Sequence, residues 1–132
     1  MSRRGFIRRA LGTVAVAAFA AQAAPALAGE FPEHPIRWLV PFSAGGGSDL
    51  ATRIVAKHVS QALGQPVVVE NRPGAATIVA AQETARAAPD GYTLMTAGMS
   101  TLSLNPWLYK QLPYDPWKDL KPVSTLVALP IV

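Results

Sequence analysis

The amino-acid sequence predicts an α/β fold with an open, mostly parallel sheet and flanking helices. Three observations lead to this prediction. Short apolar runs alternate with helical segments, the first and third runs end in glycine and hydroxyl residues, and prolines or glycines separate the elements. Strands and helices that alternate in this way are typical of parallel sheets with crossover helices. In such sheets ligands bind at the carboxyl edge of the strands.

The first strand is expected at residues 36–42, where Arg37 alone interrupts an apolar run. Such a run is typical of a strand that is covered on both faces. A helix is expected at 50–63, with Ser48 as its N-cap and Gly64 as a left-handed C-cap.

The apolar face of this helix is expected to lie on the sheet, because one apolar stripe runs along it. Asp49 places a negative charge in the first turn, at the positive end of the helix dipole, which is a structural role. The residues of the apolar stripe are Leu50, Ala51, Ile54, Val55, Val59, Ala62 and Leu63.

The next elements are a strand at 67–69, a helix at 77–88 that Pro89 ends, and a strand at 92–97. Two short turns follow, each with an N-cap residue before a proline. The cap residues are Asn105 and Asp115, and the aromatic residues expected to pack this irregular segment are Trp107, Tyr109, Tyr114 and Trp117.

The amino terminus has the pattern of an export signal. Arg3 and Arg4 precede an aromatic and an aliphatic residue, and an uncharged, alanine-rich stretch runs on to Ala28. Residues 1–28 are therefore predicted to be a signal peptide of twin-arginine type that is cleaved near Ala28, which places the mature chain in the periplasm. An ordinary Sec signal with a pair of arginines is the alternative.

Charge and cysteine content exclude several classes of function. The chain has 12 lysines and arginines against 8 aspartates and glutamates, and four of the arginines lie in residues 1–28. Residues 29–132 therefore hold eight charges of each sign, and this balance gives no support to a nucleic-acid partner. Without cysteine the chain can form no disulfide, thiolate metal site or cysteine nucleophile.

A glycine-rich loop, PFSAGGGSDL at residues 41–50, joins the first strand to the first helix. Its backbone N–H groups at a helix N-terminus are suited to an anion, and we expect a positive φ or a close ligand approach at Gly46. The alternative is a tight connection with no ligand. The loops at 43–48 and 98–101 are expected to face one crevice, although the hydroxyls of the second loop could serve only to satisfy backbone groups.

Enzyme motifs are incomplete. The loop lacks the lysine of a phosphate-binding GxxxxGK[ST] motif, and its spacing is not GxGxxG. Ser100 lacks the second glycine of GxSxG, and His34 and His58 have no partners at matching distance. We predict no catalytic residue, no metal and no cofactor, and a nucleotide- or phosphate-binding enzyme domain is the weaker alternative.

Four segments, PFSAGGGSD, LGQPVVVENRPGA, APDGYTL and LNPWLYKQLPYDPWKDLKPVS, resemble in order and spacing the amino-terminal lobe of Bug-type receptors. These are the periplasmic solute-binding proteins of tripartite tricarboxylate transporters, and the resemblance runs from about Pro35 to the end. It implies two α/β lobes that close over a small carboxylate-bearing solute, which is then handed to the membrane subunits of the transporter.

The resemblance also implies ligand contacts from three loops, mostly through backbone groups. The chain departs from the family pattern in the second loop, where NRPGAATIVAA is one residue shorter than usual and lacks further glycines. The implied residues are Phe42, Ser43, Ala44, Gly45, Gly46, Gly47, Ser48 and Asp49 in the first loop, Ala75 and Thr77 in the second, and Gly98, Met99, Ser100 and Thr101 in the third.

Family members continue well past the length of this chain. We therefore expect residues 29–132 to form the first lobe, with the apolar residues 129–132 heading into a further element. An exported, truncated remnant without binding activity is the alternative.

Overall fold

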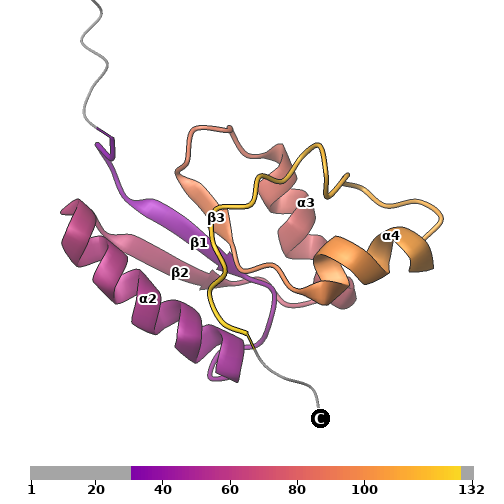
Figure 1. Ribbon diagram of the computed structural model, residues 1–132, viewed down its shortest axis with the longest axis horizontal. Coiled ribbons are helices and arrows are strands. Elements are labelled where there is room, and N and C mark those ends of the chain that lie inside the picture. The colour runs from indigo at the N-terminus through magenta and orange to yellow at the C-terminus, as the bar shows by residue number, and fades with distance from the viewer. Residues whose placement is uncertain (1–30, 129–132) are drawn as a thin grey trace, which may run out of the picture.

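The computed structural model describes residues 31–128, which form a three-stranded parallel sheet with helices packed on it (Figure 1). The strands are β1 (Ile36–Val40), β2 (Val67–Asn71) and β3 (Thr93–Met95), in the order β2-β1-β3. This arrangement confirms the predicted α/β class.

Two expectations fall outside the described part of the chain. The predicted signal peptide, residues 1–28, and the apolar residues 129–132 both lie there. Between residues 31 and 128, no helix combines the length and the apolar character needed to cross a membrane.

The central strand β1 forms the middle of the core. Its register pairs Ile36 with Val67 on one side and Arg37 with Thr93 on the other. Leu39 and Val40 are completely buried. An apolar run without regular alternation is expected when both faces of a parallel strand are covered.

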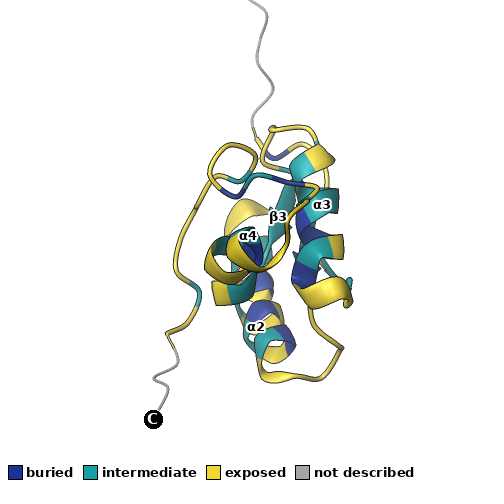
Figure 2. Cartoon of the chain, turned by 90° about the vertical axis from the view of Figure 1, so that its right-hand side faces the viewer, coloured by how far each residue is buried: buried dark blue, intermediate teal, exposed yellow. Residues whose placement is uncertain are grey.

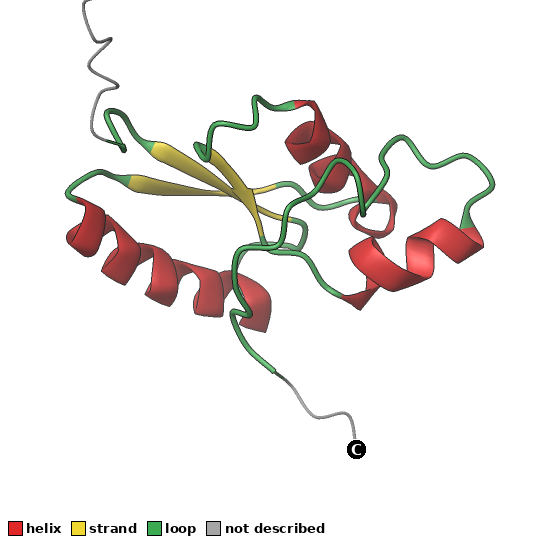
Figure 3. Cartoon of the chain, turned by 45° about the horizontal axis from the view of Figure 1, so that its top comes forward, coloured by secondary structure: helices red, strands yellow, loops and turns green. Residues whose placement is uncertain are grey.

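The two longer helices, α2 (Gly47–Leu63) and α3 (Ile78–Arg86), cover opposite faces of the sheet (Figure 3). Shorter turns complete the chain: the 3₁₀ turn η2 (Ala75–Thr77), the π-helical turn η3 (Ser100–Leu104) and α4 (Asn105–Leu108). Figure 2 shows buried residues on α2 and α3 toward the sheet and mostly exposed residues along the segment after α4.

The start of α2 differs from the prediction. The helix begins at Gly47, its N-cap is Gly46, and no side chain caps it, so the assignment of Ser48 as the cap was wrong. The first helical hydrogen bond runs from the Leu50 N–H to the Gly46 carbonyl at 3.0 Å, which places Ser48 inside the first turn. Gly64 adopts the expected left-handed C-cap with φ 67°.

The face of α2 that lies on the sheet also differs from the prediction. The buried residues are Asp49, Thr52 and Ala56, whereas Leu50 and Ile54 are 54% and 62% exposed. Polar groups hold the inward face: the Thr52 hydroxyl donates to the Ser48 carbonyl at 2.7 Å and lies 2.8 Å from the hydroxyl of Thr96 beyond β3. Hydrogen bonding rather than apolar area therefore sets the rotation of this helix.

The two predicted caps have different outcomes. Asp115 does cap a turn, since its Oδ1 accepts the N–H groups of Trp117 at 2.9 Å and Lys118 at 3.2 Å. Asn105 does not cap α4, whose N-cap residue is Leu104. The Asn105 side chain is 1% exposed and points into the protein, where it contacts the second loop.

The aromatic residues near the end of the described chain do not pack as a group. Tyr114 is buried, but Trp107 is 90% and Trp117 is 78% exposed. The expectation that all four aromatics pack the irregular segment was therefore wrong for the two tryptophans, and Tyr109 is exposed as well, at 42%. Nothing in the described residues covers these two rings.

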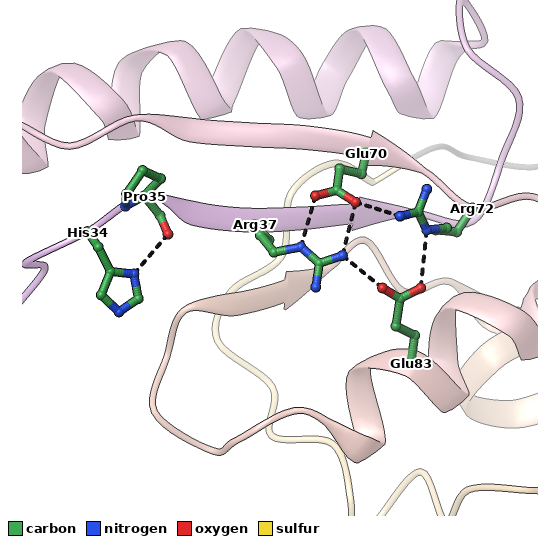
Figure 4. Close-up of polar contacts among 6 residues, drawn as sticks. All are labelled: His34, Pro35, Arg37, Glu70, Arg72 and Glu83. Atoms are coloured by element: carbon green, nitrogen blue, oxygen red, sulfur yellow. Dashed lines mark hydrogen bonds and ion pairs between the residues drawn. The ribbon is translucent and has the colours of Figure 1, made fainter.

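An ion network joins α3 to the sheet (Figure 4). Arg37 of β1 contacts Glu70 of β2 at 2.8 Å and Glu83 of α3 at 2.8 Å, and Arg72 contacts the same two carboxylates. Hydrogen bonds from Arg37 lower the pKa of both glutamates. Arg37, which in the sequence only interrupts an apolar run, is therefore a cross-link between three elements.

A buried carboxylate holds the turn between β1 and α2. Asp49 accepts hydrogen bonds from Arg53 Nε at 3.0 Å, from the Gly45 N–H at 2.8 Å and from Asn71 Nδ2 at 3.0 Å. Asn71 also donates to the Phe42 carbonyl at 3.0 Å, so the end of β2 is tied to the same turn. The bonds from Arg53, Gly45 and Asn71, in that order, lower the pKa of Asp49 from 3.8 to about 2.

We predict that Asp49 contributes to stability in a pH-dependent way. Its folded pKa lies below its unfolded value, so the unfolded state binds more protons and stability rises with pH. The contribution should be complete above pH 3.8 and lost as the pH falls through about 2. Urea unfolding of the wild type and Asp49→Asn should show a stability difference that is largest above pH 3.8 and shrinks toward zero near pH 2.

Asp90→Asn is the matched control, because the Asp90 carboxylate accepts one N–H, that of Tyr92 at 3.0 Å, in the turn before β3. A wild-type minus Asp49→Asn difference that stays constant from pH 5 to pH 2 would contradict the assigned role.

Candidate functional site

Three loops leave the same edge of the sheet, because all three strands are parallel. The first loop joins β1 to α2, the second runs from the end of β2 to α3, and the third follows β3. Asn71 ties the first two loops together, and the hydroxyls of Thr77 and Thr101, 2.8 Å apart, tie the second to the third. The loops predicted to share a crevice thus lie at one edge, where open α/β sheets bind ligands.

The first loop is exposed from Phe42 to Gly47, and it ends in the first turn of α2. Its positive φ lies at Gly45 (82°), whereas Gly46 has φ −75°. Of the two alternatives expected at Gly46, the positive φ is therefore wrong and the close ligand approach stays a prediction. The Gly45 N–H is taken by Asp49, and the Gly46 N–H lies 3.4 Å from the Ser43 carbonyl.

The first turn of α2 adds backbone donors to this loop. The N–H groups of Gly47, Ser48 and Asp49 have no acceptor within the helix, because the first helical hydrogen bond runs from the Leu50 N–H to the Gly46 carbonyl. They carry the positive end of the dipole of a 17-residue helix. An anion at this position would be stabilised without any cationic side chain.

Asp49 does not oppose an anion here, although it lies in the same turn. Its side chain is 3% exposed and its charge is paired with Arg53. The carboxylate stabilises the loop conformation by accepting a hydrogen bond from the Gly45 N–H. This geometry supports the structural role expected from the sequence, and a direct ligand contact from Asp49 stays a prediction.

The second loop has an unusual backbone. Ala75, Ala76 and Thr77 all have positive φ, at 43°, 50° and 76°, directly after Gly74 at 130°. The left-handed conformation costs roughly 1–2 kcal/mol for each residue that has a Cβ. Ala75 is exposed toward solvent, whereas Thr77 is buried at 5% exposure, with its hydroxyl on Thr101.

The third loop has one half that a ligand could reach and one half that it could not. Met99 is 62% exposed, Gly98 and Ser100 are half-buried, and Thr101 is completely buried. Residues 100–104 form a π-helical turn, a rare conformation that is frequent at functional sites. The Thr101 hydroxyl lies 2.8 Å from the Thr77 hydroxyl of the second loop, and ligand contacts from residues 98–101 stay a prediction.

Several supporting residues were missed from the sequence. Arg53 stands four residues after Asp49, a spacing that indicates an ion pair on a helix. Asn71 could have been suspected from its place at the end of a strand. The bond from Trp38 Nε1 to Thr96 at 3.0 Å, which continues to Thr52, has no signal in the sequence because it joins residues far apart along the chain.

Other kinds of site find little support. Across residues 31–128 no three His, Cys, Asp or Glu side chains come together as a metal site would need. A shallow groove lies between α2 and β2, lined by Lys57, Gln61 and Val67 among others. Arg53, which pairs with Asp49 and donates to Asn71, is also one of its lining residues.

Comparison with known proteins identifies the relatives of this chain. Residues 51–132, more than half of the chain, match the model of the tripartite tricarboxylate transporter family receptor. A UPF0065 protein of Bordetella bronchiseptica is 48% identical over 101 residues, which are 76% of this chain and 30% of that protein. Protein BugT of Bordetella pertussis is 41% identical over 111 residues, 83% of this chain and 34% of BugT.

Solved structures agree with these relatives. MatC (Rpa3494) from Rhodopseudomonas palustris, solved with bound malate, matches 73% of this chain and 33% of its own at 38% identity and a TM-score of 0.69. R. palustris Rpa4515, solved with adipate, matches 67% of this chain and 29% of its own at 32% identity and a TM-score of 0.63.

The chain spans about a third of the length of these curated relatives. The family match is consistent with the parallel α/β sheet and with the glycine-rich first loop described above. The chain belongs to the family of tripartite tricarboxylate transporter receptors, which are solute-binding proteins and not enzymes.

Proposed function

We propose that residues 29–132 supply the first lobe of a periplasmic receptor that captures a small carboxylate-bearing solute. The observation that carries this proposal is the first turn of α2, which follows an exposed loop at the carboxyl edge of the sheet and whose N–H groups at Gly47, Ser48 and Asp49 have no acceptor within the helix. The competing carboxylate, Asp49, is buried and paired there. The loop can therefore accept an external carboxylate in a position that its own acid does not occupy.

The chemistry favours a carboxylate over a neutral solute. Backbone N–H groups at a helix N-terminus stabilise negative charge, and a carboxylate oxygen is small enough to approach glycine backbone. The related MatC was solved with malate and Rpa4515 with adipate, which are both dicarboxylates. A second carboxylate on the solute would need donors from outside the first loop, such as the second and third loops or a facing wall.

We further propose that the solute is delivered to membrane subunits of a tripartite transporter and that a second lobe supplies the facing wall. The three loops form an open shelf, on which Phe42 and Met99 are 39% and 62% exposed. Small ligands bind tightly when most of their surface is enclosed. One lobe alone leaves the outer side of the solute in water.

Binding by the 132-residue chain should accordingly be weak. A helix dipole contributes roughly 0.3–1 kcal/mol and water competes for each donor, so we expect dissociation constants no tighter than about 1 mM, equivalent to about 4 kcal/mol. NMR titration of the exported chain with malate, adipate and citrate should shift the amide signals of Gly47 and Ser48. Micromolar binding would show that one lobe suffices. Amide signals that stay unchanged at a solute concentration 50-fold above about 1 mM would favour the alternative, a truncated remnant without binding activity.

The glycines of the first loop offer a matched pair of substitutions. Gly45→Ala should strain a residue at φ 82° by about 1–2 kcal/mol and weaken malate binding by up to about tenfold. Gly46→Ala is the control, because φ is −75° and an added Cβ would lie 3.5 Å from the Ser43 carbonyl, an ordinary contact. Equal malate affinity in both variants would reduce the loop to a simple turn.

Export by the twin-arginine route is a separate proposal, based on Arg3 and Arg4. Replacing both arginines by lysine should leave the precursor in the cytoplasm, as shown by fractionation and immunoblotting. The control replaces Arg8 and Arg9, which lie outside the pair, in the same way. Mature protein that reaches the periplasm at the wild-type rate after Arg3→Lys/Arg4→Lys would indicate the Sec route.

A further inference from the structure

The second loop holds three consecutive residues in a conformation that residues with a Cβ avoid. Ala75, Ala76 and Thr77 have φ values of 43°, 50° and 76°. A β-branched residue at positive φ is a true outlier, and such conformations persist only where the surroundings impose them. Local backbone hydrogen bonds run from the Thr77 N–H to the Gly74 carbonyl at 3.0 Å and from the Ile78 N–H to the Ala75 carbonyl. Neither of them holds the carbonyl of Ala76, the middle residue of the run.

A buried polar cluster from the segment 101–114 contacts this loop. Asn105 Nδ2 donates to the Ala76 carbonyl at 2.8 Å and lies 3.5 Å from the Thr77 hydroxyl. The Thr77 and Thr101 hydroxyls are 2.8 Å apart. The side chain of Asn105 thus holds the middle residue of the left-handed run by its carbonyl, and Thr101 holds the last residue by its side chain.

Tyr114 is the fourth member of the cluster and contacts both Thr101 and Asn105. Its hydroxyl donates to the Thr101 carbonyl at 2.8 Å and lies 3.3 Å from Asn105 Nδ2. Thr77, Thr101, Asn105 and Tyr114 are each no more than 5% exposed. Hydrogen bonds between such groups cannot be exchanged for water without opening the segment, so the cluster imposes its geometry on the loop.

We propose that Asn105 and Tyr114 are positioning residues for solute binding: they hold the loop Ala75–Thr77 in its left-handed conformation at the carboxyl edge of the sheet. This inference rests on the proposed function, because it gives the second loop a role in binding the carboxylate solute. Neither side chain touches the solute, and both act through the backbone of the loop. The polar cluster replaces the conformational freedom that glycines would otherwise provide.

The test uses the full chain, purified after export, with malate as the probe. Asn105→Ala and Tyr114→Phe should each raise the dissociation constant for malate, Asn105→Ala by about three- to tenfold and Tyr114→Phe by less, since it leaves the Asn105 bond to Ala76. Amide hydrogen exchange at residues 75–78 should become faster in both variants, while exchange in β1 stays unchanged.

A rescue separates positioning from general stability. Ala75→Gly/Ala76→Gly added to Asn105→Ala should recover at least half of the lost affinity on a logarithmic scale, since glycine adopts positive φ without strain. Tyr92→Phe is the matched control for Tyr114→Phe, because the Tyr92 hydroxyl accepts one backbone N–H, that of Glu33 at 2.8 Å, far along the chain from the loop. It should leave malate binding and loop exchange unchanged.

Two results would overturn the inference. The first is that amide exchange at residues 75–78 in Asn105→Ala is as slow as in the wild type. The second is that adding Ala75→Gly/Ala76→Gly to Asn105→Ala restores no malate affinity, although the two variants have lost equal amounts of stability in unfolding measurements. If the wild type does not respond to malate or adipate, the proposed function fails. The exchange measurement still tests the cluster in that case, so the two failures can be told apart.

Discussion

The pairing of Asp49 with Arg53, Asn71 and the Gly45 N–H is the interaction on which the rest of the candidate site depends. One buried carboxylate joins the turn after β1, the first turn of α2 and the last residue of β2. An acid in a first helical turn is common, but here it is also removed from solvent. The consequence is a helix N-terminus whose own negative charge is paired internally, while the N–H groups of its first turn have no acceptor within the helix.

The same principle, buried polar groups that fix exposed backbone, recurs elsewhere in the chain. Thr52, Thr96 and Trp38 form a hydrogen-bonded chain that sets the rotation of α2. In residues 31–128 no buried side-chain nitrogen or oxygen lacks a partner. Buried polar networks that are fully satisfied specify one arrangement more strictly than apolar contacts do. This property suits the proposed function, in which the lobe binds its solute mainly through backbone atoms.

Sequence reasoning predicted the fold class, the element order and the position of the first loop, because these depend on local patterns such as the apolar run at 36–42 and the glycines at 45–47. It failed for the inward face of α2, since the apolar stripe with Leu50 and Ile54 points outward. The reason is physical. Asp49 and Thr52 find partners 22 and 44 residues away, and no local pattern reports such contacts.

In the candidate site, too, local features could be predicted from the sequence and long-range contacts could not. The glycine loop and its helix N-terminus can be recognised locally. Which glycine has the positive φ cannot: it is Gly45, whose N–H donates to Asp49. Asn105 was assigned to a helix cap on the strength of the following proline, and its side chain instead reaches a loop 29 residues earlier. Residues that support a loop from another element remain invisible until the tertiary structure is known.

The distance in sequence between the second loop and its supports has a consequence for the order of folding. Contacts over 24 and 29 residues connect Thr77 to Thr101 and Ala76 to Asn105. Closing such separations costs chain entropy before any contact is gained. The sheet edge can form as soon as β3 pairs with β1, but the loop reaches its final shape only after the chain has been synthesised and docked beyond Tyr114. A nascent or proteolysed chain that ends earlier would keep the sheet and lose the conformation of the second loop.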